Sequence, residues 1–214
     1  MRVKGRFFPS QGLFRLWIGM SGVLLACTVL GPPASAENRE LADTELRAVL
    51  ERIEASEAFQ RAAARERDPR LYRVGSWAYE SEPEGGRQRT LAEVLYFKYE
   101  GGITIRVQID LDSLAVQQVE ALEAYPTPLS PEEEAQAVSL ARENSEAVRS
   151  LLARSGEDEV DVEMLNPVIS NRDDPRYGHR IVYVTFRRNT GNPESAMVEV
   201  DLTAKNARPQ GANR

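Results

Sequence analysis

The residues best suited to catalysis in this 214-residue sequence are few, and they stand apart from one another. His179 is the only histidine. It follows the turn-like segment DDPRYG at the edge of a predicted strand, where a lone histidine is more often a surface residue or a loop partner than a general base. Ser56 and Ser145 are candidate nucleophiles, but no histidine or lysine accompanies either one. We therefore predict no catalytic residues and no enzyme.

Carboxylates are abundant, since the chain has 33 Asp and Glu residues, but they do not form a recognisable site. The run EDEVDVE at 157–163 has the ligand type that calcium prefers, yet it lacks the glycine-containing loop of a calcium site. At strand spacing its acidic residues share one solvated face. No phosphate-binding glycine loop and no G-x-S-x-G motif occurs. We predict no metal and no cofactor, and keep hydrolysis by a carboxylate pair as the third hypothesis.

Aromatic residues are concentrated on the predicted strands. In the stretch from Val94 to Tyr99, apolar side chains occupy both alternating phases, so both faces of this strand are apolar. A sheet that is apolar on both sides is not left in water, so one face should pack on its own helix and the other on the second module or on a partner protein. The residues that we assign to a partner surface are Trp77, Tyr79 and Tyr96.

Residues 1–36 are typical of an export signal. Four basic residues and no acidic residue flank an apolar run from Leu16 to Leu30, and the small residues of ASA precede the polar stretch that starts at Glu37. Cleavage after Ala36 takes the formal net charge from −6 to −10 and removes Cys27, the only cysteine, so that no disulfide is expected. The alternative uses LLAC as a lipoprotein box, with Cys27 as a lipid anchor.

Two stretches 89 residues apart are similar, namely ASEAFQRAAAR at 55–65 and NSEAVRSLLAR at 144–154. Apolar residues recur at spacings of three and four in both, which predicts one amphipathic helix in each, with Ser56 or Ser145 as a small residue in its buried stripe. The shared pattern predicts that one module is written twice.

Each predicted helix is followed by three stretches with strand periodicity. They are Leu71–Glu80, Leu91–Tyr99 and Ile103–Leu111 in the first copy, and Val160–Asn166, His179–Arg188 and Ala196–Leu202 in the second. We therefore predict an α+β fold with two tandem copies of a helix packed on a curled antiparallel sheet. The expected divisions are a first module at 37–124, a linker at 125–130, a second module at 131–204 and a disordered tail at 205–214.

The segments PLSPEE and HRIVYVTFRRNTGNPESAMVEVDLTAKNA resemble cystatin-like and PepSY-type domains. They are similar in particular to the small noncatalytic domains that precede the catalytic part of copper amine oxidases, which also come as a tandem pair. The resemblance covers roughly residues 40–204. The amine oxidase catalytic domain needs three histidine copper ligands and a tyrosine-derived quinone, so with one histidine here the resemblance implies neither copper nor oxidase activity.

The acidic balance makes nucleic acid a poor partner, and no stretch after the export signal is long and apolar enough to span a membrane. We expect a periplasmic or secreted protein that works by binding, as an accessory, inhibitory or assembly subunit of another exported protein. The alternative is a carrier that holds a small ligand on the concave face of a sheet.

Overall fold

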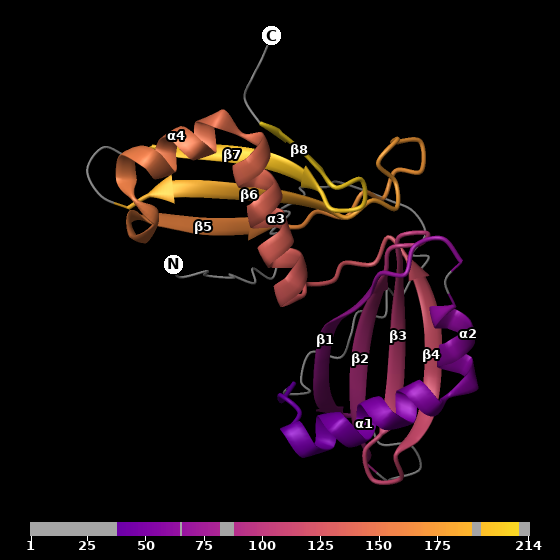
Figure 1. The fold of residues 1–214 in the computed structure, drawn as a ribbon. Coiled ribbons are helices and arrows are strands. Elements are labelled where there is room, and N and C mark those ends of the chain that lie inside the picture. The colour runs from indigo at the N-terminus through magenta and orange to yellow at the C-terminus, as the bar shows by residue number, and fades with distance from the viewer. Residues whose placement is uncertain (1–37, 65, 82–87, 190–193, 210–214) are drawn as a thin grey trace, which may run out of the picture.

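A computed structural model describes residues 38–64, 66–81, 88–189 and 194–209. The predicted export signal at 1–36, with Cys27, lies outside the described residues. The chain has two halves with the same order of elements, two helices followed by four strands (Figure 1). The first half has α1 Asp43–Ala55, α2 Glu57–Ala63, β1 Leu71–Glu80, β2 Thr90–Lys98, β3 Ile103–Asp110 and β4 Ala115–Glu123. The second has α3 Pro131–Asn144, α4 Glu146–Ser155, the 3₁₀ turn Glu157–Glu159, β5 Val160–Leu165, β6 Ile181–Arg188, β7 Ser195–Asp201 and β8 Asn206–Pro209.

The prediction of one helix per half is wrong, because each helix is interrupted at its serine. Ser56 and Ser145 both have extended backbone, and each hydroxyl oxygen accepts a hydrogen bond from the backbone N–H three residues later. This is the geometry of an N-cap, which satisfies an N–H that has no partner within the helix. Ser56 therefore starts α2, and Ser145 starts α4.

Each half contains an open antiparallel sheet of four strands, with its strands in chain order. The prediction of three strands missed β4 and β8. In both places a short hairpin turn returns the chain. Asp110 accepts a hydrogen bond from the backbone N–H of Ser113 at 2.8 Å, and Asp201 accepts one from that of Ala204 at 2.9 Å. Residues 206–209, predicted as part of the tail, therefore pair with β7.

The helices cover one face of each sheet. Val49, Ile53 and Phe59 pack on the buried side chains of β2 and β3 in the first half, and Val148 and Leu151 pack on those of β6 and β7 in the second. Figure 1 shows the helices of both halves on the viewer's side of their sheets, so the two other faces point away from the viewer. These faces, which carry no helix of their own, are called the first and second open faces.

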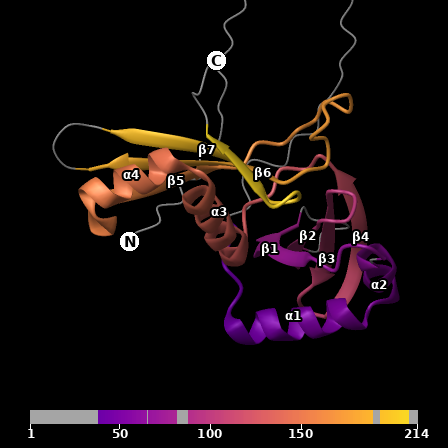
Figure 2. The same cartoon turned by 45° about the horizontal axis from the view of Figure 1, so that its top comes forward.

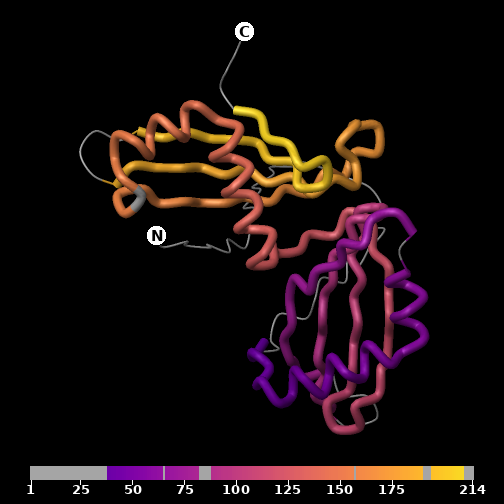
Figure 3. The backbone as a smooth tube through the Cα atoms, viewed as in Figure 1, coloured from indigo at the N-terminus to yellow at the C-terminus, as the bar shows by residue number. Residues whose placement is uncertain are grey.

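The two halves meet where the sequence leaves β4 and enters α3. Figure 2 shows α3 running from the second sheet toward the first, and Figure 3 traces the short connection from β4 to α3. Ser130 caps α3 and Pro131 is its first residue, as the sequence predicts. Among the described residues, no helix has the length and apolar content needed to cross a membrane.

Candidate functional site

A buried ion pair of the second half lies where the two halves meet. Arg180, which precedes β6, donates from Nε to Oε1 of Glu133 in α3 at 3.1 Å, and both side chains are almost fully buried. The Tyr99 hydroxyl of the first half donates to the same oxygen at 2.8 Å. Burial and the Glu133 carboxylate raise the pKa of Tyr99. Arg180 also donates to the Thr127 hydroxyl at 2.7 Å, so every charge in this cluster has partners.

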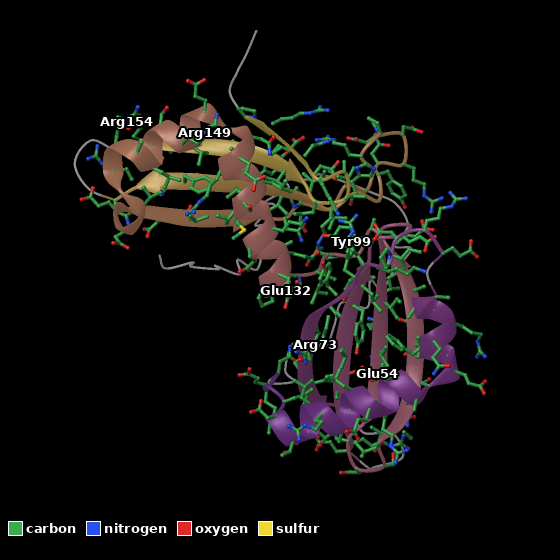
Figure 4. All side chains as sticks on the ribbon, viewed as in Figure 1. Glu54, Arg73, Tyr99, Glu132, Arg149 and Arg154 are labelled. Carbon is green, nitrogen blue, oxygen red and sulfur yellow. The ribbon has the colours of Figure 1, made fainter. Side chains whose placement is uncertain are left out.

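A second arginine, Arg70, also contributes to the contact between the two halves, which we call the joint. Arg70 precedes β1 and donates to the backbone carbonyls of Leu202 at 2.7 Å and Thr203 at 3.1 Å, both in the second half. Its guanidinium carbon lies 4.0 Å from the centre of the Tyr99 ring, while that of Arg180 lies 4.4 Å from the centre of the Phe97 ring. Each half thus supplies one arginine that binds the other half. Figure 4 shows Tyr99 between the two halves.

Arg70 is the last residue of the sequence Asp-Pro-Arg at 68–70, and the same sequence occurs again at 174–176. In both copies the aspartate accepts hydrogen bonds from the backbone N–H, Nε and Nη2 of the arginine two residues later. The bonds from Arg176 lower the pKa of Asp174 to about 2. The third guanidinium nitrogen, Nη1, binds a different group in each copy. Arg70 Nη1 donates to the Leu202 carbonyl, and Arg176 Nη1 donates to the Glu199 carboxylate. The turn predicted at Asp174 is confirmed.

Two glycines allow the backbones of the halves to touch. Gly102 and Gly178 both have positive φ, and a Cβ added to Gly102 would lie 2.0 Å from the carbonyl oxygen of Gly178. The crevice beside them has a volume of about 30 Å³, room for about one water molecule. His179 lines it, and its Nδ1 lies 2.7 Å from Oδ2 of Asp201. The histidine therefore pairs with the aspartate that closes the β7–β8 turn, as expected of a loop partner.

Two carboxylates of the segment at 157–163, Glu159 and Glu163, lie at the surface. Glu159 and Glu163 are exposed, whereas Val160 and Val162 are buried, which confirms the predicted alternation. Glu163 lies 3.7 Å from Arg187. In the part of the chain that the structure describes, no three His, Cys, Asp or Glu side chains are grouped so that they could hold a metal ion.

The aromatic residues assigned to a partner surface do not form one surface. Tyr96 is only 8% exposed and packs under the helices, with its ring centre 4.9 Å from that of Phe59. Trp77 and Tyr79 are half-buried on the first open face, and the Tyr79 hydroxyl accepts a hydrogen bond from Gln108. The assignment of Tyr96 is corrected, because its cross-strand register with Arg73 puts it on the helix-covered face.

The first open face is largely covered from within the chain. Leu95, Phe97 and Tyr99 are buried there and belong to the same core cluster as the second half. Tyr125 and Leu129 of the connection pack against this cluster. The two faces of β2 are apolar for different reasons. The side chains on one face contact the helices of the first half, and those on the other face contact the connection and the second half.

The second open face keeps exposed apolar side chains. Leu165 is 65% exposed and Met197 is 44% exposed, and the strand register places both on this face. Val168, 37% exposed, follows just after β5, and these three are the exposed large apolar residues among those described. The second open face is defined by Asp161, Glu163, Leu165, Tyr183, Thr185, Arg187, Ser195, Met197, Glu199 and Arg208.

Sequence reasoning missed this surface. The alternation that buries Val160 and Val162 already puts Leu165 in the outward phase with Glu163, and that was the available signal. The register between β6 and β7, which brings Met197 to the same face, was not available from the sequence.

No protein-family model matches this chain, and no curated protein matches it significantly.

Proposed function

We propose that this protein is an exported, noncatalytic binding protein that docks onto another exported protein through the second open face. The observation that supports the proposal best is the exposure of Leu165 and Met197 on a sheet face that carries no helix. Apolar side chains gathered on one face favour contact with another molecule, because burying them removes apolar area from water.

The charges of this region favour a partner surface that is apolar and nearly neutral. The face has three acidic residues and two arginines, and Arg176 lies beside it. Glu163 lies 3.7 Å from Arg187, and Glu199 lies 3.2 Å from Arg176. Asp161 and Arg208, which form no ion pair within the described part of the chain, have opposite signs. The surface thus differs from the acidic chain as a whole, whose formal net charge is −6.

The contacts at the joint support this role, because they fix the second half, and with it the second open face, relative to the first half. Fixed surfaces bind more tightly than mobile ones, because less conformational entropy is lost on binding. Arg70 donates to the Leu202 carbonyl of the second half, and Arg180 lies over the Phe97 ring of the first half. We further propose that the halves arose from one cystatin-like or PepSY-type module by duplication. The shared order of helices and strands, and the serine cap at the second helix of each half, support this idea.

The test is reconstitution of a complex from the native envelope fraction. Tagged wild-type protein should capture one exported partner at a fixed stoichiometry, seen by mass spectrometry and by light scattering of the purified complex. A Leu165→Asp/Met197→Asp double variant should lose the partner while its unfolding transition stays close to that of wild type. Ala135→Asp, on the exposed side of α3, is the matched control and should keep it.

Three results would contradict the proposal: no stoichiometric partner, capture that the double variant retains, or self-association that the double variant abolishes. The last would make a second copy the occupant of the second open face. Export has its own test, since the mass of the mature protein should correspond to a chain that begins at Glu37. A lipid attached to Cys27 would replace soluble export with anchoring.

A further inference from the structure

The strand β5 lies at one edge of the second sheet, where a further strand can pair with it (Figure 1). It has six residues and contains neither proline nor glycine. The other edge strand, β8, has only four residues and ends in Pro209, which has no backbone N–H, so it is a poor template for pairing. In the first sheet, the edge strand β1 is already paired, because Ala78 and Arg39 exchange two backbone hydrogen bonds of 2.9 Å.

The pairing with β6 fixes which backbone groups of β5 point outward. The backbone N–H of Asn189 donates to the Glu159 carbonyl at 2.9 Å, and the register continues this pairing at every second residue of β5. Backbone groups alternate in direction along an antiparallel strand, so those of Val162 and Met164 point away from β6. Within the described part of the chain, neither residue makes a backbone hydrogen bond.

The side chains of β5 specify what a further strand should carry. On the helix-covered face, Val162 is buried and Met164 is half-buried, so apolar side chains fit beside them. On the second open face, Asp161 and Glu163 share one arginine of β6, because the only ion pair that the two make within the described chain is Glu163 with Arg187. Opposite charges on neighbouring strands attract, so basic side chains fit beside these carboxylates.

The edge strand β4 of the first half is the competing candidate. The backbone N–H of Ala121 points away from β3 by the same alternation. However, none of the large exposed apolar residues of the described chain lies on β4. Its carboxylates also have counter-ions, since Glu120 pairs with Arg106 and Glu123 pairs with Arg172. Apolar exposure and uncompensated charge therefore both favour β5.

We propose that the exported partner adds an extended segment to β5 as a fifth strand of the second sheet. Apolar residues of this segment alternate with lysine or arginine, which lie beside Asp161 and Glu163, and an apolar residue covers Leu165. The charges of the whole face still nearly cancel, because Arg208 lies on the opposite edge strand, β8. This inference rests on the proposed function, since it names the kind of segment that docks at the second open face.

The experiment is backbone amide hydrogen exchange, followed by NMR on the full mature chain. The probe is a synthetic peptide of about nine alternating lysine and valine residues with blocked ends, added at about 1 mM. Exchange at Val162 and Met164 should slow at least about tenfold. Exchange at Asp161 and Glu163 should change little, because their N–H groups already bond to β6.

A peptide of alternating glutamate and valine is the control for charge, and it should bind at least about tenfold more weakly. Equal binding of the two peptides would overturn the proposal. The same holds if the lysine peptide protects Val162 and Met164 no more than Asp161 and Glu163.

Variants locate the paired edge. Met164→Pro removes an outward N–H but no hydrogen bond to β6, so it should weaken binding of the lysine peptide at least about tenfold. Met164→Leu keeps the N–H and should bind as wild type does. Ala121→Pro, which blocks the edge of β4 in the same way, should also leave binding unchanged. Loss of binding in Ala121→Pro but not in Met164→Pro would place the site on β4 and contradict the proposal.

Capture of the exported partner separates this inference from the proposed function. Strand addition predicts that Met164→Pro loses the partner, as Leu165→Asp/Met197→Asp does. If Met164→Pro keeps a partner that the double variant loses, the partner docks on the face without adding a strand, so this inference is wrong while the proposed function stands.

Discussion

The hydroxyl of Tyr99, the residue after β2, donates a 2.8 Å hydrogen bond to Oε1 of Glu133 in the first turn of α3. This bond crosses from one half to the other, and Glu133 at the same time accepts from Arg180 and from the backbone N–H of its own helix cap, Ser130. A carboxylate with no solvent exposure therefore serves both as the start of a helix and as the anchor of the joint.

Neutralising Glu133 should destabilise the whole chain. Glu133→Gln leaves the Arg180 guanidinium, 5% exposed, without its counter-ion, and breaking a buried pair in this way costs about 3–5 kcal/mol. Urea unfolding measures the change. Glu132→Gln, at the exposed neighbouring position, is the control, and equal effects of the two substitutions would contradict a special role for the buried carboxylate.

Replacing the capping serine should have a smaller and more local effect. Ser145→Ala removes the oxygen that accepts from the backbone N–H of Val148, which costs about 1 kcal/mol. Ser139→Ala, on the exposed side of α3, should be neutral or slightly stabilising, because alanine is the better helix former. Circular dichroism and urea unfolding measure both. If Ser145→Ala were as neutral as Ser139→Ala, the Ser145 hydroxyl would not stabilise the helix, and only the small size of the side chain would be important.

Closing the glycine contact between the halves should also destabilise the chain. Gly102→Ala puts a methyl group against the Gly178 carbonyl in addition to straining a positive φ, and we expect a loss of about 3 kcal/mol or more. Gly156 has a similar φ of 77°, but an added Cβ there meets nothing within 4 Å. Gly156→Ala should therefore cost less, about 1–3 kcal/mol from backbone strain alone. Similar losses in the two variants would mean that the halves can separate without cost.

Stability should fall in alkaline solution because of Tyr96. Burial, helped by the Glu54 carboxylate, raises the pKa of this phenol from 10.0 to about 12. The unfolded chain releases the proton first, so the stabilisation is complete below pH 10 and is lost as pH rises from 10 to about 12. Tyr96→Phe should lose less stability over this interval. Equal slopes of stability against pH in wild type and variant would contradict the shifted pKa.

Several elements could be predicted because their signals are local. The strand Leu71–Glu80 has the predicted bounds, and Ser130 with Pro131 starts α3 as their types require. The break at Ser145 could not be predicted in the same way. Its apolar neighbours keep helical spacing across it, so periodicity alone reads as one helix. The fourth strands were missed because β4 carries many polar residues and β8 has only four residues.

The candidate sites depended on the tertiary structure even more strongly. Trp77 and Tyr96 looked equivalent as strand aromatics, yet the register of β1 against β2 puts them on opposite faces. The exposed pair Leu165 and Met197 comes from β5 and β7, which are separated in the sheet by β6. No spacing in the sequence connects them.

The sequence by itself determined the α+β class, most strand positions and the start of α3, because alternation, capping and turn chemistry act between residues close together in the chain. Only the tertiary structure decided that Arg70 and Arg180 bind across the joint, that Tyr96 lies inside, and that the second open face keeps its apolar side chains exposed. Those outcomes depend on which surfaces meet, and contacts between residues up to 133 positions apart, as for Arg70 and Thr203, leave no periodic trace in the sequence.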